Sequence, residues 1–173
     1  MAAIKYAAQK RIKIVVAESR PLCEGVKTAE ECARLDIKTT LITDAQMGLF
    51  IKGCSLVLVG ADAILLSGEV VNKAGTSIAA LAAKESDIPF HVISTTWKIH
   101  PGQSIILEEK SSEEVLAGSH PFSIRNNYFD ITFASYITSI ITENGSLHPT
   151  KISSLSANIQ KSYKAFVSNQ FSR

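Results

Sequence analysis

The sequence predicts an α/β fold in which one open parallel β-sheet carries helices on both faces. Three observations lead to this expectation. Short runs of β-branched residues alternate with segments whose apolar residues recur at helical intervals. The strand-like runs are apolar throughout, which is typical of strands covered on both faces. The length of 173 residues suits one domain with a sizeable core, and alternating strands and helices build right-handed parallel crossovers.

The first half of the chain is predicted to hold two strand–helix units and the strand that follows them. The expected strands are 11–16, 38–43 and 55–60, and the expected helices between them are 23–35 and 44–51. The second helix can begin at Asp44, whose carboxylate would cap it. A further helix over 74–86, capped by Thr76 or Ser77, leads to a fourth strand over 89–94.

After the fourth strand the alternation of strands and helices loosens. Residues 95–130 are rich in turn-forming residues, and only 111–118 has the composition of a short helix. Helical periodicity returns over 134–145 and would end with Gly145 as the residue after the helix. The following segment, 146–151, is the candidate for a last short strand.

The organisation of the whole chain is simple, because no repeat and no shift in composition marks a boundary. We expect one domain over residues 1–148 and a tail over 149–173, whose weak periodicity fits either a helix or a mobile end. The opening residues lack the pattern of a secretory signal, and no apolar run reaches the roughly 18 residues that span a bilayer. No membrane partner is therefore expected.

Composition and charge narrow the classes of partner. Hydrophobic residues make up 46% and charged residues 20% of the chain, which is typical of a folded globular protein. The formal net charge is +2 and no cluster of Lys and Arg occurs, so direct nucleic-acid binding is not expected. Three cysteines without metal-binding spacing, Cys23, Cys32 and Cys54, indicate free thiols in a reducing cytoplasm.

The segment after the third strand contains the first candidate site residues, since ligands bind beyond the carboxyl ends of parallel strands. Asp62 has apolar neighbours that would raise its pKa towards a value useful for acid/base chemistry, although the local pattern favours an Asp that caps a turn or the next helix. Asn72 and Lys73 precede a predicted helix start. They could offer an anion an amide, an ammonium group and free backbone N–H groups, or be a capping asparagine beside a solvated lysine.

The loop after the first strand offers a second group of candidates. The guanidinium of Arg20 could meet a phosphate or carboxylate, or form an ion pair with Glu18 or Glu24. Glu24 and Gly25 lie at the start of the next helix and could be ordinary first-turn residues. The chain has no Gly-rich nucleotide loop and no histidines at metal-ligand spacing, so neither a cofactor nor a metal is expected.

Several segments, taken together, resemble one known family in order and spacing. They are "ESRPLCEG", "TLITDA", "LVLVGADAILLSGEVVNKAGT", "AALAAKESDIPFHV" and "FDITFASYITSIITENG". The family comprises the α, β and δ regulatory subunits of translation initiation factor 2B, methylthioribose-1-phosphate isomerase and ribose-1,5-bisphosphate isomerase. The resemblance covers about residues 11–148 and implies a Rossmann-like carboxyl-terminal domain. It also implies that Asp62 matches the isomerases' catalytic acid/base and that Asn72 and Lys73 help to hold a substrate phosphate.

The sequence departs from the isomerases of this family at several points. Their amino-terminal helical domain supplies a phosphate loop, a further Arg and a catalytic Cys, which we do not find here, so half of an active site is expected to be missing. Glu24 stands where methylthioribose-1-phosphate isomerases usually have Gln, which places a second carboxylate near the ligand. Ala63 replaces an Arg common in the isomerases, and the segment around Asp130 lacks the family's usual prolines.

These observations rank three functions. The first is a regulatory or binding domain of the initiation factor 2B type that holds a phosphorylated small ligand, a sugar phosphate or a nucleotide, beyond the third strand. Arg20, Glu24, Gly25, Asn72 and Lys73 would bind it. The alternative is a sugar-phosphate isomerase, degenerate or completed by another chain, in which Asp62 would be catalytic. The third is a structural oligomerisation module.

Partners follow partly from the resemblance and partly from the predicted helix over 134–145. Family members pair through this domain, and the helix would expose apolar side chains, namely Tyr136, Ile137, Ile140 and Ile141. We therefore expect a homo-oligomer, with a two-fold dimer first. An initiation-factor complex is a further partner that the resemblance implies.

Overall fold

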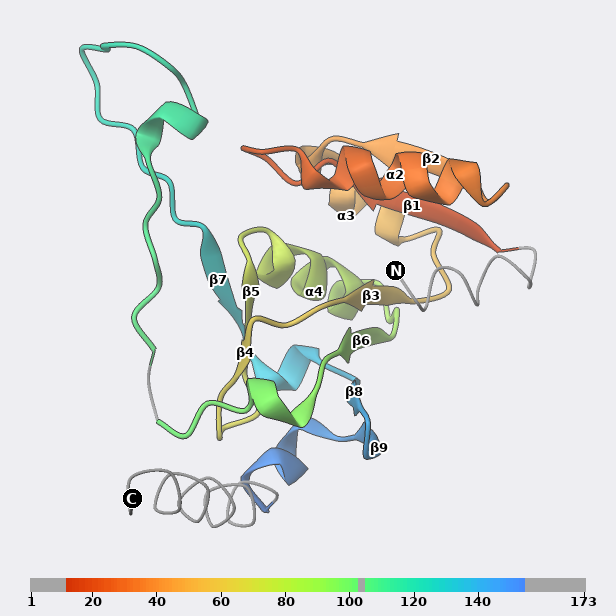
Figure 1. Cartoon of the computed structure of the whole chain (residues 1–173). Helices are drawn as coiled ribbons and strands as arrows, with labels where there is room; N and C mark the ends of the chain where they lie inside the picture. Colours follow the sequence, from red (N-terminus) through yellow and green to blue (C-terminus); the bar gives the residue numbers. More distant parts are fainter. Residues whose placement is uncertain (1–11, 103–104, 155–173) are drawn as a thin grey trace, which may run out of the picture.

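The computed structural model describes residues 12–102 and 105–154, which form a mixed α/β arrangement (Figure 1). The strands in these residues are β1 (Lys13–Ala17), β2 (Lys38–Ile42), β3 (Val57–Val59), β4 (Ala63–Ile64), β5 (Val70–Lys73), β6 (Phe90–Ile93), β7 (Phe129–Thr132), β8 (Ser139–Thr142) and β9 (Gly145–Leu147). The α-helices in the same ranges are α2 (Glu24–Arg34), α3 (Met47–Ile51) and α4 (Thr76–Glu85). Short 3₁₀ turns occupy Asp44–Gln46, Thr96–Lys98, Ser112–Glu114, Ala134–Tyr136 and Pro149–Lys151. The predictions for the opening residues and for the tail beyond residue 154 lie outside the described residues.

The strands form three hydrogen-bonded sheets rather than the single sheet predicted. β1 pairs with β2 in parallel, and β3 pairs with β6 in parallel, so the parallel alternation expected of the first four predicted strands is confirmed. β8 lies parallel to β6 on its other edge, and β9 adds to β8 in the antiparallel direction. The third sheet, β4–β5–β7, is antiparallel and was not predicted. It forms because the chain reverses at Gly68, whose φ of 86° is readily adopted only by glycine.

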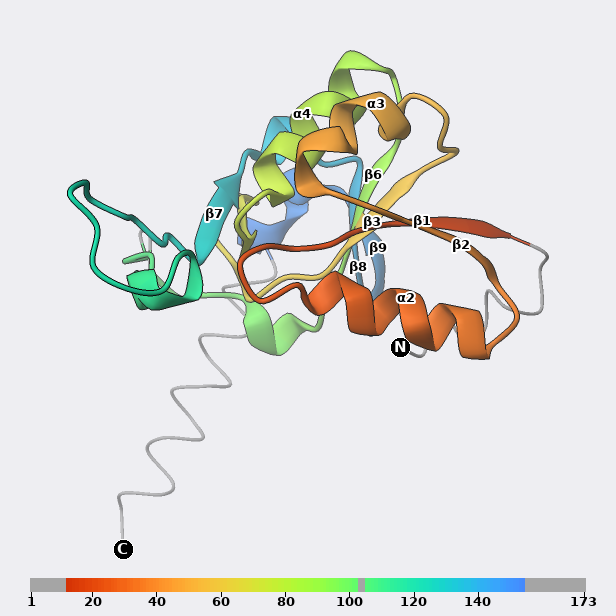
Figure 2. The same cartoon turned by 90° about the horizontal axis from the view of Figure 1, so that it is seen from above.

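Helices cover the parallel strands from two sides. α2 lies on one side of the β1–β2 pair, and α3 and α4 lie on the other (Figure 2). α4 also packs against β3, β6 and β7, which places its apolar face on the main core. The buried residues of that core come from α3 and α4, from the β3–β6–β8–β9 and β4–β5–β7 sheets, and from loops: Ile51, Ile64, Val70, Ala79, Ala80, Ala83, Phe90, Val92, Ile99, Ile137, Ile140 and Ile152. Within the described ranges, no helix is long and apolar enough to cross a membrane.

The helix predicted over 134–145 is wrong. A 3₁₀ turn at Ala134–Tyr136 is followed by β8, and Gly145, with a φ of 98°, turns the chain into β9 rather than ending a helix. The β-branched run at residues 140–142 favours a strand, and β8 fills the free edge of β6. Ile137 and Ile140 are buried in the main core. They therefore do not form the exposed dimer surface that the predicted helix would have had.

The helix over 44–51 is confirmed, but its predicted cap is not. Thr43 precedes the first turn, and its backbone N–H donates to Gln46 Oε1 at 3.3 Å. The carboxylate of Asp44 instead accepts hydrogen bonds from the backbone N–H groups of Ser19 (2.9 Å) and Arg20 (2.7 Å). Asp44 therefore shapes the loop after β1, because a nearby loop with free N–H groups competes successfully for its oxygens.

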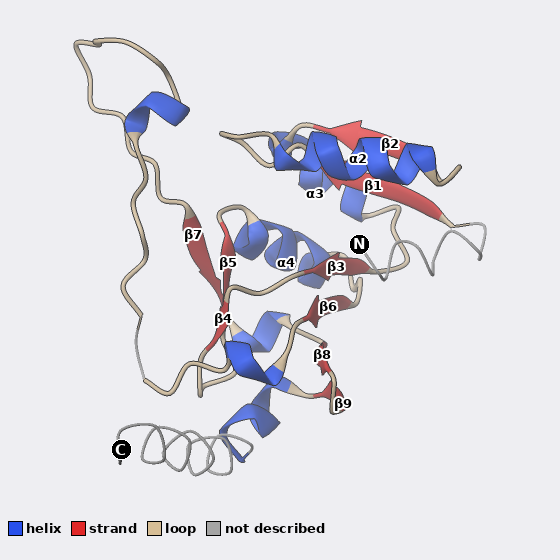
Figure 3. Cartoon of the chain, viewed as in Figure 1, coloured by secondary structure: helices blue, strands red, loops and turns tan. Residues whose placement is uncertain are grey.

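The segment between β6 and β7 runs out from the body of the chain as a long loop (Figure 3). The short helix predicted over 111–118 is a single 3₁₀ turn, capped by Ser111 Oγ, which accepts from Glu113 N at 3.3 Å. Two apolar residues at the start of the loop, Ile105 and Leu107, pack against a second small core made of Ala63, Leu65 and Val71. The loop is thus anchored at its base on the antiparallel sheet.

Gly25 allows α2 to begin immediately beside the end of β1. A Cβ atom at this position would lie 1.9 Å from the carbonyl oxygen of Ala17, and the Gly25 N–H donates to the carbonyl oxygen of Glu18 at 3.0 Å. No side chain fits in that space. The glycine therefore sets the position of the first turn of α2, including the neighbouring Glu24.

We predict that Gly25→Ala lowers the free energy of unfolding by about 3 kcal/mol, because the new methyl group must push α2 away from β1. Gly48→Ala is the matched control, since nothing lies within 4 Å of its Cβ position. That variant should change stability by less than about 1 kcal/mol. Urea unfolding followed by circular dichroism measures both variants, and equal stability of the two would contradict this account of Gly25.

Candidate functional site

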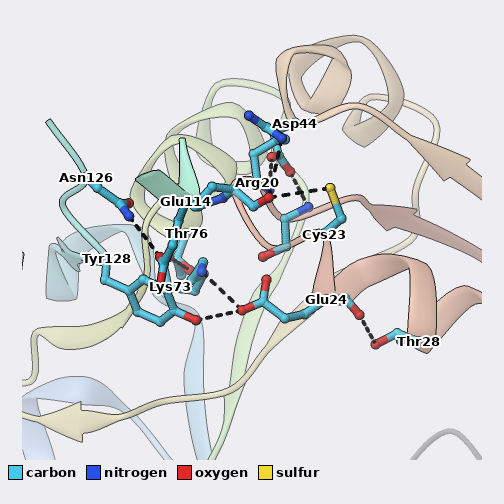
Figure 4. Close-up of polar contacts among 12 residues, drawn as sticks. Arg20, Cys23, Glu24, Thr28, Asp44, Lys73, Thr76, Glu114, Asn126 and Tyr128 are labelled. Atoms are coloured by element: carbon cyan, nitrogen blue, oxygen red, sulfur yellow. Dashed lines mark hydrogen bonds and ion pairs between the residues drawn. The ribbon is translucent and has the colours of Figure 1, made fainter. Parts of the chain in front are cut away.

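Three side chains from distant parts of the sequence meet beyond the end of β1 (Figure 4). Glu24 lies in the first turn of α2, Lys73 is the last residue of β5, and Tyr128 immediately precedes β7. Lys73 Nζ lies 3.2 Å from Glu24 Oε1 and 3.3 Å from the centre of the Tyr128 ring. The Tyr128 hydroxyl donates to the same carboxylate oxygen at 2.8 Å. The lysine is therefore held by a carboxylate and an aromatic face together.

Burial and charge give this cluster its electrostatic character. The Lys73 side chain is only 17% exposed, whereas that of Glu24 is 44% exposed. Burial acts to raise the pKa of Glu24, but hydrogen bonds from Tyr128, from the Glu24 backbone N–H and from Lys73, together with the charge of Lys73, outweigh it and lower the pKa. Glu24 is therefore ionised at neutral pH, and it neutralises the ammonium group of Lys73.

The start of α4 is also occupied by a carboxylate of the chain. Asp130, in β7, accepts hydrogen bonds from the backbone N–H groups of Gly75 (2.7 Å) and Ser77 (3.1 Å). Burial raises the pKa of Asp130, and these two hydrogen bonds oppose that effect. The N-cap residue of α4 is Gly75, with a φ of 103°, rather than the predicted Thr76 or Ser77. A phosphate therefore does not find these N–H groups free, contrary to the sequence-based expectation.

Asn72 braces the turn between β5 and α4. Its side-chain Nδ2 donates to Thr76 Oγ1 at 3.0 Å, and that hydroxyl donates to the carbonyl oxygen of Lys73 at 2.6 Å. These bonds fix the backbone from which Lys73 extends. Asn72 thus has the structural role that the sequence left open.

Asp62 lies apart from the Glu24–Lys73–Tyr128 cluster. Its side chain is 47% exposed and its nearest charged group is Lys98 Nζ at 3.9 Å. Its backbone N–H donates to the carbonyl oxygen of Val71 at 2.8 Å, which holds it at the entry of the antiparallel sheet. The sequence-based expectation was an Asp62 enclosed by its apolar neighbours, but Ala63 and Ile64 are buried in the core while the Asp62 side chain stays half-exposed.

Arg20 connects the loop after β1 to the long loop between β6 and β7. Its Nη2 donates to the carbonyl oxygen of Val115 at 2.9 Å. In the described part of the chain it forms no ion pair with Glu18 or Glu24, so neither of those alternatives applies. Of the two cations proposed to bind a ligand, Lys73 and not Arg20 pairs with Glu24 in the described residues.

The residues that sequence reasoning missed are Tyr128 and Asp130. Both lie in "NNYFDIT", where the alternation of side chains along β7 is the available signal. Their partners are 50 or more residues away in the sequence, so no local pattern indicates the contacts. Among the described residues, no group of His, Cys, Asp and Glu is arranged to hold a metal ion, and the three cysteines are free thiols.

Comparisons with known proteins support one family. The sequence profile of the Initiation factor 2 subunit family matches residues 1–149. A translation initiation factor eIF-2B subunit 2-like protein of Pyrococcus abyssi is 40% identical over 146 residues, which cover 83% of this chain and 51% of that protein. A ribose 1,5-bisphosphate isomerase of Methanocaldococcus jannaschii is 44% identical over 151 residues, which cover 83% of this chain and 49% of that protein.

Solved structures give the same result. A crystal structure of 5-methylthioribose 1-phosphate isomerase from Pyrococcus horikoshii has a TM-score of 0.83 at 27% identity and covers 91% of this chain and 49% of that one. The P. horikoshii translation initiation factor eIF-2B has a TM-score of 0.78 at 40% identity and covers 86% of this chain and 54% of that one. The chain thus spans about half the length of the relatives that it matches.

We predict that Asp130→Ala lowers the free energy of unfolding by about 1 to 2 kcal/mol, because it leaves two N–H groups at the start of α4 without their acceptor. Glu85→Ala, at the opposite end of the same helix, is the control and should change stability by no more than about 0.5 kcal/mol. Thermal and urea unfolding measure the difference. If both variants were equally stable, the carboxylate of Asp130 would not be the cap of α4.

Proposed function

Because the chain belongs to the Initiation factor 2 subunit family, we propose that it is a regulatory or binding domain of the initiation factor 2B type. In this proposal it holds a phosphorylated small ligand beyond β3, with Lys73 as the residue that contacts the phosphate. The single observation that carries the proposal is the position of Lys73. Its side chain is largely buried at the end of β5, and its ammonium group faces Glu24 in the first turn of α2 (Figure 4).

A buried ammonium group suits a phosphate for a physical reason. Hydrogen bonds between ionised partners contribute about 1.5 to 3 kcal/mol each, and the contribution is larger where water is excluded. The other ligand contacts in the proposal come from Asn72, from the first turn of α2 at Glu24 and Gly25, and from Arg20. Relatives named as isomerases of ribose 1,5-bisphosphate and methylthioribose 1-phosphate support a sugar phosphate, and a nucleotide shares the same phosphate chemistry.

The same proposal covers how the parallel strands combine into one sheet. We infer that β2, β1, β3, β6 and β8 act as one open Rossmann-like sheet within a single domain over residues 1–148. The parallel pairings, the helices on two sides of β1–β2, and the likeness to the isomerase structure support this (Figure 2). Three free cysteines fit a reducing, cytoplasmic setting.

The alternative is a sugar-phosphate isomerase in which Asp62 moves the proton. The 44% identity to a ribose 1,5-bisphosphate isomerase favours it. Asp62 and its ion-pair partner Lys98 are both about half-exposed, whereas proton transfer of this kind needs groups held in a dry pocket. We therefore place ligand binding first and turnover second.

We also propose that the chain self-associates, first as a dimer. A purely structural oligomerisation module is the third candidate function, after ligand binding and isomerase activity. The predicted helix over 134–145 does not supply the surface. Three other apolar side chains are exposed on neighbouring helices, Leu49 of α3 with Ile78 and Leu81 of α4. An apolar face on two packed helices is a common feature of two-fold interfaces. An initiation-factor complex would be a second partner for the same domain.

Lys73→Met should weaken the binding of ribose 5-phosphate at least about tenfold, because it removes the ammonium group and keeps the aliphatic stem. Lys52→Met, on the exposed end of α3, is the matched control and should bind as the wild type does. Isothermal titration with ribose 5-phosphate, ribose 1,5-bisphosphate, methylthioribose 1-phosphate and AMP measures the affinities. Equal affinity of the Lys73 and Lys52 variants would place the phosphate elsewhere.

The same titration samples decide between binding and turnover. Product formation from ribose 1,5-bisphosphate or methylthioribose 1-phosphate is followed with the wild type and with Asp62→Asn. We expect binding without turnover at an enzymatic rate. Robust turnover that Asp62→Asn abolishes would favour the isomerase over the regulatory domain.

Sedimentation equilibrium tests the proposed self-association. We expect the wild type to have the mass of a dimer at micromolar concentration and Leu81→Glu to have that of a monomer, because a charge in an apolar interface is costly. Ile106→Glu, which alters an exposed apolar residue of the long loop, is the control and should remain dimeric. A monomeric wild type would remove self-association from the proposal.

A further inference from the structure

The carboxylate of Glu24 occupies the position on Lys73 that a ligand anion would take. Its Oε1 lies 3.2 Å from Lys73 Nζ and also accepts from the Tyr128 hydroxyl. The two groups approach each other from opposite sides, one from α2 and one from β5 (Figure 4). A phosphate that binds Lys73 directly must therefore compete with Glu24 for the ammonium group.

We propose that Glu24 is a specificity-determining residue that acts as an internal anion on Lys73 and makes the site selective for phosphates that carry hydroxyl groups. The inference rests on the proposed function, since it concerns the ligand held by Lys73. It adds the residue that enforces a preference for hydroxyl-bearing phosphates over orthophosphate, and the way it does so, by competing for Lys73.

The selectivity follows from what each ligand offers the displaced carboxylate. Once a phosphate takes Lys73, Glu24 loses its cationic partner, while the Tyr128 hydroxyl stays on Oε1. Its second oxygen, Oε2, is already buried without a hydrogen bond among the described residues. A buried, ionised oxygen without a hydrogen bond is energetically costly, so a ligand that brings a hydrogen-bond donor to it is favoured. A sugar hydroxyl next to the phosphate supplies one, whereas orthophosphate mainly adds negative charge beside Glu24.

The arrangement around the pair favours movement of Glu24 rather than of Lys73. Lys73 is the more buried of the two side chains and lies over the ring of Tyr128 at 3.3 Å. Its backbone is fixed by the Asn72–Thr76 hydrogen bonds. The Glu24 side chain as a whole is 44% exposed, although its Oε2 is buried, and it extends from the first turn of a helix, so it can rotate towards solvent while α2 stays in place.

Glu24→Gln tests the inference because it keeps the shape and a hydrogen-bond acceptor but removes the charge. Affinities for orthophosphate and ribose 5-phosphate are measured by titration in the full chain. We expect the variant to bind orthophosphate at least about tenfold more tightly than the wild type, and to gain less for ribose 5-phosphate. The preference for the sugar phosphate should therefore shrink. Glu30→Gln, on the exposed side of the same helix where Glu30 pairs with Arg34, should leave both affinities unchanged.

Two further variants separate a change in specificity from a loss of structure. Tyr128→Phe keeps the ring beneath Lys73 but removes the hydroxyl that holds Glu24, and should give a smaller gain in the same direction. Glu24→Gln combined with Lys73→Met should lose the gain, because the released ammonium group is then absent.

The outcomes that contradict the inference differ from those that contradict the proposed function. If Lys73→Met weakens ribose 5-phosphate binding but Glu24→Gln does not improve orthophosphate binding, the inference fails and the function stands. An equal gain for both ligands would remove the selectivity. If no variant binds either ligand, both the inference and the function fail.

Discussion

The contact between Asp130 and the start of α4 is the constraint on which the rest of the site depends. It joins three elements at one point, because β7 carries the carboxylate, β7 pairs with β5, and the N–H groups belong to the turn that leads from β5 into α4. The end of β5 therefore has one defined position relative to the helix. Lys73 is the last residue of that strand, so its direction is set by a hydrogen bond that it does not itself make. Gly25 does the same for Glu24 on the other side, by allowing α2 to touch the end of β1.

The sequence suggested two places where a ligand anion could bind, the start of α4 and the ammonium group of Lys73. In the structure, carboxylates of the chain itself bind at both. Asp130 accepts the N–H groups at the start of α4, and Glu24 holds the ammonium group of Lys73. The two cases differ in burial and in the groups that bind each carboxylate. Asp130 is half-buried in a strand and bonded to backbone N–H groups, whereas Glu24 is more exposed and bonded to side chains. For this reason the Glu24 position is the one where an external phosphate can compete.

Much of the fold was predictable because its signals are local. The β-branched runs of β1, β2, β3 and β6 and the periodicity of α2 and α4 lie within ten or so consecutive residues, and each was placed correctly. β8 was mistaken for a helix, since Ile137, Ile140 and Ile141 recur at helical spacing and only the free edge of β6 selects the strand. Glu24, Lys73 and Asn72 were named as site residues from motif and resemblance. Their hydrogen-bond partners were not, because Tyr128 lies 104 residues from Glu24.

The sequence by itself determined the order of strands and helices, the parallel direction of the first four predicted strands, and the family, because these depend on side-chain pattern along the chain. Tertiary structure alone decided which charges meet. It made Asp62 half-exposed beside Lys98, brought Glu24 onto Lys73, and placed Asp130 where a phosphate had been expected. The physical reason is that the energy of a charge depends on distance and burial, and both are set by segments that meet only after the chain has folded.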